Sequence, residues 1–206
     1  MRLRYRRPLC AAFAIFAITL LSACGRGEDA AAGPYAFEEA IQRGDLARAE
    51  RLLLQRYGWD CGYANTEYVF TPLHWAVVSG SGDLVARLLK RIEDDGQPSR
   101  IDARDQNGYT PLMWAAGDGQ LVALQLLIQA GAGLDLQSGE DGHTALHYAI
   151  ASPRPIAKLL VRMLLDAGAD TYIQNSWGRD ALAFANARTL PETAALILAA
   201  REAKDE

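Results

Sequence analysis

Apolar residues in the middle of the chain recur at helical spacing in two short segments. Residues 105–132 read DQNGYTPLMWAAGDGQLVALQLLIQAGA. Thr110 is suited to an N-cap, and Pro111 to the first helical position, where the missing proline N–H costs nothing. The pattern predicts a turn followed by a short first helix that ends near Ala116.

A second helix is predicted directly after the first. Gly117, Asp118 and Gly119 form the break, and leucines at helical spacing continue over residues 120–130. Gly131 is placed where a helix commonly ends in the left-handed conformation. Such a helix pair cannot bury its own apolar faces, so the pattern predicts neighbouring units of the same kind.

The opening of the first helix recurs three more times in the chain. The copies are Thr71-Pro72-Leu73-His74-Trp75-Ala76, Thr144-Ala145-Leu146-His147-Tyr148-Ala149 and Asp180-Ala181-Leu182-Ala183-Phe184-Ala185. From one cap residue to the next, the four copies are 39, 34 and 36 residues apart.

This motif resembles that of the ankyrin-repeat family, whose signature is T-P-L-H-x-A in a period of 33 residues. The resemblance covers residues 36–206. It implies an all-α solenoid of about five helix-turn-helix units with hairpin-like turns, in which the first and last repeats are degenerate caps.

Helix boundaries outside the central unit follow from the same signals. The first repeat is predicted as helices over residues 36–43 and 46–55, with Gly44 and Asp45 as break and cap. Asp83 is predicted to cap a helix over residues 84–92, and the last helix is predicted over residues 190–200, followed by an exposed charged tail. Longer loops are expected over residues 57–70 and 93–100.

The N-terminus is typical of an export signal. Four arginines precede an apolar run, residues 9–21, that is too short to span a bilayer. Leu21-Ser22-Ala23-Cys24 resembles the lipobox of bacterial lipoproteins, which implies cleavage before Cys24 and its lipidation. The expected domains are a signal peptide (1–23), a lipid-anchored linker (24–35) and the repeat domain (36–206). The alternative is an ordinary signal peptide with a chance cysteine.

Gly25, in place of Asp, follows the lipobox cysteine. In bacterial lipoproteins this implies an outer-membrane anchor, with the protein facing the periplasm. Loss of residues 1–23 removes four arginines and no acids, which leaves 17 basic and 25 acidic residues, a net charge of −8. An acidic, exported chain argues against nucleic acid as a partner. It is compatible with a basic protein partner or with solubility alone.

No residue pattern indicates catalysis, so we expect a protein that is not an enzyme and has no cofactor. Asp135, Glu140 and Asp141 could suggest calcium, but their spacing fails the EF-hand template and a solvated turn is favoured. After processing, Cys61 is the one thiol left, so it cannot form an internal disulfide. It is either buried and inert or exposed for an intermolecular bond.

Two histidines occupy the histidine position of the repeat motif, His74 and His147. The resemblance implies that each imidazole hydrogen-bonds backbone and ties adjacent turns together. Met113 and Ala183 stand at the same position in the other two repeats, so those ties are missing. His143 lies on a turn and is expected to face solvent.

Four aromatic residues stand four positions after the caps: Trp75, Trp114, Tyr148 and Phe184. The interpretation favoured here is a stack that packs between repeats; the alternative is a ligand groove.

Ankyrin-repeat proteins bind partners on a concave face made by the turns and the exposed side of the first helices. The residue before each cap is therefore a candidate partner-binding position. These residues are Phe70, Tyr109, His143 and Arg179, and the expected flanking residues are Gln106, Asn107, Asp118, Ser138, Glu140, Asp141, Ser176 and Trp177. Exposed aromatics and arginine are frequent anchors of interfaces.

The expected function is a monomeric, lipid-anchored module that binds a protein partner in the cell envelope. One such role is an immunity protein or an inhibitor of a toxin or enzyme. The alternative is a structural, assembly or stress-defence accessory factor of the envelope.

Overall fold

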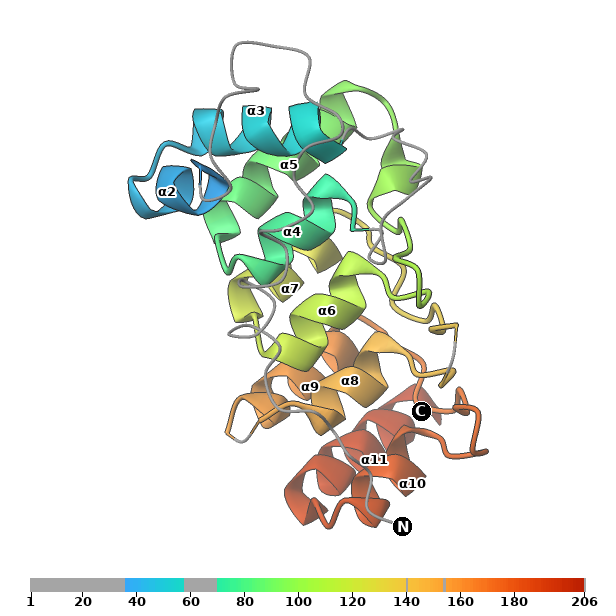
Figure 1. Ribbon diagram of the computed structural model, residues 1–206. Helices are drawn as coiled ribbons and strands as arrows, with labels where there is room; N and C mark the ends of the chain where they lie inside the picture. Colours follow the sequence, from blue (N-terminus) through green and yellow to red (C-terminus); the bar gives the residue numbers. More distant parts are fainter. Residues whose placement is uncertain (1–35, 58–69, 140, 154, 206) are drawn as a thin grey trace. The chain divides into compact units, whose positions relative to one another are not determined.

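The computed structural model describes residues 36–57, 70–139, 141–153 and 155–205 (Figure 1). The chain divides into two compact units, residues 1–66 and 67–206. The described part of the first unit is a helix pair, α2 (Ala36–Gln42) and α3 (Leu46–Tyr57), whose helices pack on each other. Gly44 turns the chain with φ +70°, and Asp45 Oδ1 accepts from the amide of Arg48 at 3.0 Å, so the predicted break and cap are confirmed.

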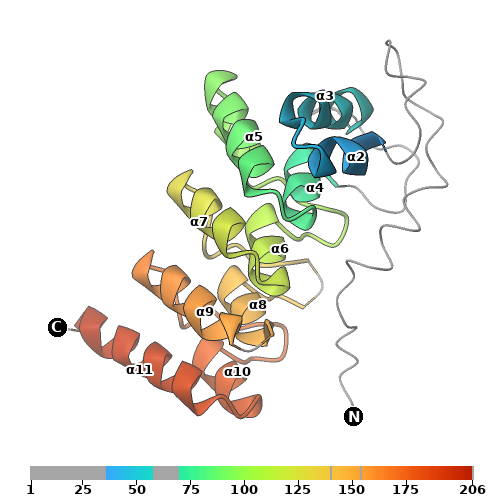
Figure 2. The ribbon, with the colours of Figure 1, turned by 90° about the vertical axis from the view of Figure 1, so that its left-hand side faces the viewer.

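The described residues of the second unit form four successive helix pairs. They are α4 (Pro72–Val78) with α5 (Gly82–Asp94), α6 (Pro111–Asp118) with α7 (Leu121–Gln129), α8 (Ala145–Ala151) with α9 (Ile156–Asp166), and α10 (Ala181–Ala187) with α11 (Pro191–Asp205). A short 3-10 helix, η2 (Pro98–Arg100), follows α5. Within this unit the first helices of the pairs form one layer and the second helices another (Figure 2). The described residues contain no strand. The predicted all-α architecture of repeated helix pairs is therefore confirmed.

The predicted cap and glycine stops of the central repeat are confirmed, although α6 continues through Gly117 and Asp118, which were predicted to form the break. The Thr110 hydroxyl accepts from the amide of Met113, and Pro111 occupies the first turn of α6. Gly119 ends α6 with φ +76°, and Gly131 follows α7 with φ +84°. Both glycines adopt the left-handed conformation that side chains with a Cβ disfavour.

Several predicted helix ends are wrong, among them the ends of α6 at Asp118 and of α5 at Asp94, each two residues beyond the prediction. Helix α5 begins at Gly82 because Ser81, and not Asp83, is its N-cap, with the Ser81 hydroxyl accepting from the amide of Leu84. Helix α11 continues to Asp205, so the charged segment after Ala200 is helical.

Helix α11 continues because its last turns have a polar partner on the preceding turn. Arg201 is half-buried and donates to Thr171 Oγ1, to the Thr171 carbonyl and to Asp180 at 2.7–2.9 Å. Its guanidinium also lies 4.1 Å from the centre of the Tyr172 ring. The C-terminal helix is thereby attached to the segment that enters α10.

Leucines from both layers form the core of the second unit. Those less than 2% exposed are Leu73, Leu84, Leu88, Leu112, Leu124, Leu127, Leu146, Leu160 and Leu164. Each leucine buried in this way stabilises the fold by about 1.5–3 kcal/mol relative to an exposed position. Fully buried alanines, such as Ala76, Ala115 and Ala149, allow the helices of the first layer to approach closely.

Within the described ranges, none of the helices combines the length and the apolar character needed to cross a membrane. The predicted export signal, Cys24 and Cys61 lie outside the described residues, as does nearly all of the predicted loop over residues 57–70.

Candidate functional site

Three long turns connect the helix pairs of the second unit and lie next to one another. We call them by the helix that each precedes: the α6 turn (101–110), the α8 turn (132–144) and the α10 turn (169–180). The amide of Gly139 donates to the carbonyl of Asn107 at 3.0 Å, and the amide of Ser176 donates to the carbonyl of Asp141 at 2.9 Å. Backbone hydrogen bonds thus hold each turn in register with the next.

Side chains at equivalent places add to these links between turns. Arg104 donates to the carbonyl of Gln137 at 2.6 Å, and Gln137 in turn donates to the carbonyl of Gln174 at 2.8 Å. Asp102 accepts from the amide of Gly133, and Asp135 accepts from the amide of Asp170. Because each turn is bonded to its neighbour, the three present their tips as one edge.

Asp105 organises the α6 turn from within. Its Oδ1 accepts from the amides of Asn107 and Tyr109, both at 2.9 Å, and its Oδ2 accepts from the indole N–H of Trp114 at 2.9 Å. The Asp105 side chain is buried. The turn and the first helix are therefore joined through one carboxylate.

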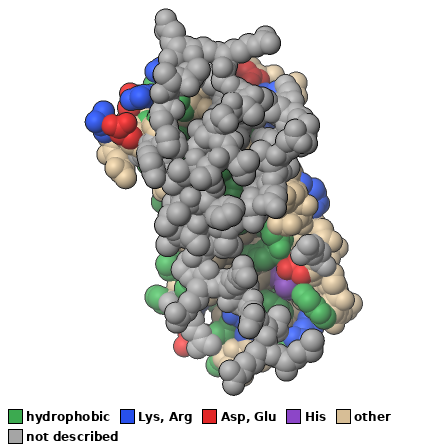
Figure 3. Space-filling view, viewed as in Figure 1, with side chains coloured by type: hydrophobic (Ala, Val, Ile, Leu, Met, Phe, Trp, Pro, Cys, Tyr) green, Lys and Arg blue, Asp and Glu red, His purple; other side chains and the backbone are tan. Residues whose placement is uncertain are grey.

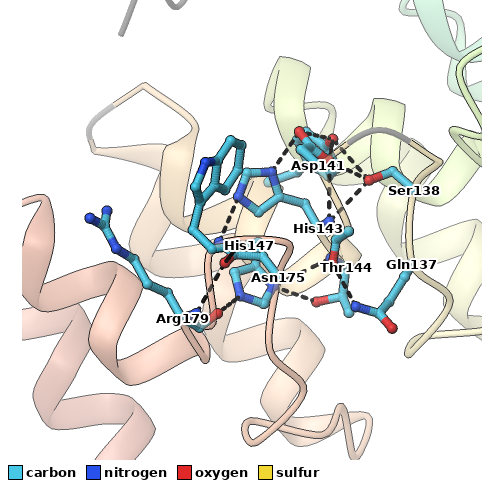
Figure 4. Close-up of polar contacts among 11 residues, drawn as sticks. Gln137, Ser138, Asp141, His143, Thr144, His147, Asn175 and Arg179 are labelled. Carbon is cyan, nitrogen blue, oxygen red and sulfur yellow. Dashed lines mark hydrogen bonds and ion pairs between the residues drawn. The ribbon is translucent and has the colours of Figure 1, made fainter. Parts of the chain in front are cut away.

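The α8 turn achieves the same connection with a different residue. The α8 turn has one residue more between Ser138 and the cap Thr144 than the α6 turn has between Asp105 and the cap Thr110. Ser138 thus occupies the place that Asp105 has in the α6 turn. The carboxylate comes instead from Asp141, which accepts from the amide of His143 at 3.1 Å and from the hydroxyls of Ser138 and Tyr148 (Figure 4).

The ionised form of Asp141 is favoured by these contacts. Burial by itself would raise the pKa of Asp141, but hydrogen bonds from His143 and Ser138 outweigh burial and hold the pKa well below its usual range. Burial raises the pKa of the Tyr148 hydroxyl, so this group keeps its proton and remains a donor. Asp141 is therefore engaged in an internal polar network, whereas Asp135 on the same turn is exposed, as expected of a solvated turn.

His143 belongs to this network and is 9% exposed, so the expectation that it faces solvent is wrong. Its Nδ1 lies 2.7 Å from Asp141 Oδ2, and its Nε2 lies 3.1 Å from the side-chain nitrogen of Asn175. Asn175 Oδ1 accepts from the amides of Trp177 and Arg179, which orients the Asn175 amide nitrogen toward His143. The arrangement requires the proton on Nδ1 and engages both ring nitrogens within the protein.

The two motif histidines tie neighbouring turns together, as predicted. His74 Nε2 donates to the carbonyl of Tyr109 at 3.0 Å, and His147 Nε2 donates to the carbonyl of Arg179 at 3.1 Å. The Nδ1 atoms accept from the amides of their own caps, Thr71 and Thr144. Burial lowers the pKa of each imidazole to about 4, which keeps both rings neutral.

The corresponding tie between the α6 repeat and the α8 turn is missing because Met113 replaces histidine. Its sulfur accepts from the amide of Thr110 at 3.5 Å. A thioether has no proton to donate to the next turn.

The aromatic residues of the turns and helices form one continuous row. Phe70 lies between Trp75 and Trp114, with ring centres 5.4 and 5.1 Å away. Tyr109 lies between Trp114 and Tyr148, at 6.1 and 5.5 Å. His143 lies between Tyr148 and Phe184, at 5.3 and 5.0 Å.

We call this set the aromatic row: Trp75, Phe70, Trp114, Tyr109, Tyr148, His143 and Phe184. Most of its contacts are edge-to-face or tilted, the arrangement that aromatic pairs favour. The predicted packing of the four helix aromatics between repeats is confirmed. The residues before the caps are predicted from the sequence to form a separate, exposed line, whereas three of them complete this row.

Burial divides the predicted partner-binding residues into three groups. Phe70 (3% exposed), His143 and Ser138 are buried, so their predicted exposure is wrong. Half-buried are Asn107, Tyr109, Asp118 and Asp141, and exposed are Gln106, Ser176, Trp177 and Arg179. Glu140 lies outside the described residues.

The exposed residues are concentrated on the α10 turn. Trp177 is 59% exposed, and its ring centre lies 5.5 Å from that of His143 at the end of the aromatic row. In the space-filling view, a histidine, an acidic side chain and hydrophobic side chains lie together where Figure 1 draws the turns (Figure 3).

Gln137 and Asn175 both join neighbouring turns but are not among the residues predicted from the sequence. A signal for Asn175 was present, since it stands five residues before the cap Asp180, as Asp105 stands five residues before Thr110. In the described part of the chain, no three His, Cys, Asp or Glu side chains gather in a way that could hold a metal ion.

Comparison with known proteins identifies the repeats. A family model for ankyrin repeats matches residues 92–175 in three copies. A putative ankyrin repeat-containing protein of Treponema pallidum is 32% identical over 128 residues, which are 62% of this chain and 40% of that protein. A probable palmitoyltransferase, AKR2, of Saccharomyces uvarum is 34% identical over 110 residues, 52% of this chain and 14% of that protein.

Another similar protein is the mouse B-cell lymphoma 3 protein homolog, 37% identical over 119 residues, which are 57% of this chain and 24% of that protein. The chain spans less than half the length of each of these relatives. The shared region is the ankyrin repeats, so the names of the relatives do not assign an activity to this chain.

Proposed function

We propose that this chain, which is built of ankyrin repeats, is a non-catalytic module that binds a protein partner and is tethered to the cell envelope by a lipid on Cys24. Ankyrin repeats are a protein-interaction architecture, and the repeat type defines a way of binding and not a ligand. The observation that carries the proposal is the α10 turn. There an exposed tryptophan and an exposed arginine stand on a turn that is bonded to its neighbour.

The geometry of the turns supports a binding role. Trp177 and Arg179 are both positioned by Asn175, whose side-chain oxygen accepts from their amides at 3.0 and 3.1 Å. Side chains on a held backbone lose less entropy on association than side chains on a free loop. Tryptophan and arginine are also the residues that most often dominate binding energies in interfaces.

The proposed partner-binding face therefore consists of residues that the structure leaves accessible. They are Gln106, Asn107, Tyr109, Asp118, Ser176, Trp177 and Arg179. Phe70 and His143 are buried members of the aromatic row and are not part of this face. Asp141 is half-buried and already engaged within the α8 turn.

Affinity capture from envelope extracts tests this face. Wild type is compared with the double variant Trp177→Ala/Arg179→Ala. Leu198→Ala, which removes an exposed apolar side chain on the second-layer helix α11, is the matched control. We expect one stoichiometric partner with wild type and Leu198→Ala that the double variant loses while its thermal unfolding is unchanged. Retention by the double variant would place the interface elsewhere, and capture of nothing would contradict the binding role.

The tether is tested separately by cell fractionation in a Gram-negative host. Wild type should sediment with the outer membrane, and Cys24→Ser should appear in the soluble periplasmic fraction. Mass spectrometry of the N-terminus should show acyl chains on Cys24 in wild type. An unmodified, soluble wild-type protein would contradict the tether.

Among the possible binding roles, the negative charge of the chain favours that of an inhibitor or immunity protein. The chain after residue 23 carries a net charge of −8, which would accelerate its encounter with a basic protein. An inhibitor should abolish the partner's activity at a 1:1 ratio. A complex that leaves that activity unchanged would favour the alternative, an accessory factor in envelope assembly or stress defence.

A further inference from the structure

The ends of the first-layer helices carry a second row of equivalent residues. Asp118, Ser152 and Arg188 each stand eight residues after the cap of their repeat. Asp118 is the last residue of α6, while Ser152 and Arg188 are the C-caps of α8 and α10. These equivalent positions place an acid, a hydroxyl and a cation along one edge of the layer.

Arg188 shows how a cation is held at this edge. Its guanidinium carbon lies 5.8 Å from the centre of the Phe184 ring in its own repeat. It also donates to the carbonyl of Ala151, at the end of the preceding helix α8, at 3.3 Å. The chain itself thus places a guanidinium against an aromatic ring and the carbonyl end of a neighbouring helix, where the helix dipole favours positive charge.

One repeat earlier, none of the described residues places a cation in the same surroundings. Ser152 stands in the place of Arg188, Tyr148 in the place of Phe184 and Gly117 in the place of Ala151. Among the described residues, a methyl group on Gly117 would come within 4 Å of the Tyr148 side chain alone, at 3.8 Å. Because glycine has no side chain, the described residues leave space beside the Tyr148 ring at this point.

Two polar groups at this place have no partner among the described residues. The Ser152 hydroxyl is buried without a hydrogen bond, and it lies 3.5 Å from where a Cβ on Gly119 would stand. Asp118, beside Gly119, is half-buried and makes no ion pair with the described residues. Burial raises the pKa of the Asp118 carboxyl, and pairing with a cation would offset the cost of holding this carboxylate in its charged form.

We propose that Gly117, Asp118, Tyr148 and Ser152, here called the Asp118 cluster, bind a guanidinium or ammonium group of the partner. The partner's cation would lie against Tyr148 as Arg188 lies against Phe184, paired with the Asp118 carboxylate. This inference rests on the proposed function, because it states the chemistry that one part of the partner-binding face recognises. The partner class is a protein with an exposed arginine or lysine at the contact.

The test uses a probe that does not depend on finding the partner. N-acetyl-arginine amide is titrated into the full repeat domain, and backbone amide shifts are followed by NMR. N-acetyl-citrulline amide, which has the same shape without the charge, is the control ligand. We expect saturable shifts at Gly117, Gly119 and Ser152 with the arginine probe and affinity weaker by about tenfold or more with citrulline, as loss of one charge-assisted hydrogen bond predicts.

Variants distinguish binding at the Asp118 cluster from a general effect of the protein's negative charge. Asp118→Asn should weaken the arginine probe by about tenfold, whereas Asp83→Asn, which removes an equal charge at an exposed site on α5, should leave it unchanged. Gly117→Leu should block the probe while the domain stays folded, because its Cβ meets only ordinary van der Waals distances. Equal affinity of Asp118→Asn and Asp83→Asn, equal binding of citrulline, or no saturable shift would overturn the proposal.

This test and the capture experiment fail in different ways. A partner that is lost with Trp177→Ala/Arg179→Ala but bound normally by Asp118→Asn would keep the proposed function and remove this inference. If the extract supplies no partner, the arginine titration still decides whether the Asp118 cluster binds a cation.

Discussion

The indole N–H of Trp114 donates a 2.9 Å hydrogen bond to the buried carboxylate of Asp105, nine residues earlier. The same carboxylate accepts from the amides of Asn107 and Tyr109. Trp114 is also a member of the aromatic row, in contact with Phe70 and Tyr109. One side chain therefore couples the shape of the turn to the stacking of neighbouring repeats.

Removal of the Asp105 carboxylate should destabilise the domain strongly. Asp105→Ala leaves two backbone amides and the indole N–H without their acceptor, and we expect the free energy of unfolding to fall by about 3 kcal/mol. Urea unfolding measures the change. Gln106→Ala, exposed on the same turn, should cost less than about 0.5 kcal/mol.

A double-mutant cycle isolates the bond between the two side chains. Trp114→Phe keeps a ring in the row but removes the donor, so its cost should shrink in the Asp105→Ala background. We expect a coupling energy of about 1 kcal/mol. Additive costs would show that the indole N–H contributes nothing through Asp105.

The close approach of neighbouring turns leads to a third prediction. Gly108 has φ +78°, and a Cβ on it would lie 2.6 Å from the backbone nitrogen of Gly139. Gly131 has φ +84°, but a Cβ there would meet nothing within 4 Å. Gly131→Ala should cost about 1 kcal/mol for the backbone conformation alone.

Gly108→Ala should cost more than Gly131→Ala, because the α6 and α8 turns must also move apart. We expect at least about 2 kcal/mol in total, with faster hydrogen exchange of the Gly139 amide, which bonds to Asn107. Equal losses in the two variants would mean that contact between the turns contributes little. Thermal and urea unfolding give the comparison directly.

The repeat architecture was predictable because its signals are local. Caps such as Thr110, glycine stops such as Gly131 and apolar spacing lie within one unit, and repetition at a near-constant period amplifies them. The ties made by His74 and His147 were predicted from the motif that the repeats share.

The exposure of individual turn residues was not predictable in the same way. Phe70 and His143 are buried because rings from two successive repeats enclose them, and these contacts join residues far apart in sequence. The role of Asp141 was hidden because the α8 turn carries an extra residue and places serine where Asp105 would align. The signal that could have revealed it is the combination of a carboxylate in the turn, Asp141, with a polar aromatic residue, Tyr148, four residues after the cap.

Stability should depend on pH through the two motif histidines. The pKa of each is lowered from 6.5 to about 4 in the folded protein. Between these values the unfolded chain binds more protons than the folded chain, so the free energy of unfolding must decrease as the pH falls from about 6.5 to 4. The loss should reach about 3 kcal/mol for each histidine at the lower end.

The methionine of the central repeat provides the matched variant. His74→Met/His147→Met places at both positions the side chain that Met113 already supplies, and should lower stability at pH 7 while removing most of the slope between pH 6.5 and 4.5. Asp141 and Asp180, whose pKa values are lowered, lose their contribution only below this window. An unchanged slope in the double variant would assign the pH dependence to other groups.

The last repeat contains a strained residue where other repeats have glycine. Thr189 has φ +55°, in the left-handed region, and stands nine residues after its cap, as Gly80 and Gly119 do in earlier repeats. A β-branched residue in this conformation is unfavourable by about 1–2 kcal/mol. Thr189→Gly should therefore raise the free energy of unfolding by about 1 kcal/mol, even though it removes the hydrogen bond from the Thr189 hydroxyl to the Arg188 carbonyl. Thr189→Ala, which loses the same hydroxyl but keeps a Cβ, should gain less than Thr189→Gly. If both variants gain equally in thermal unfolding, relief comes from the branched side chain and not from the left-handed backbone.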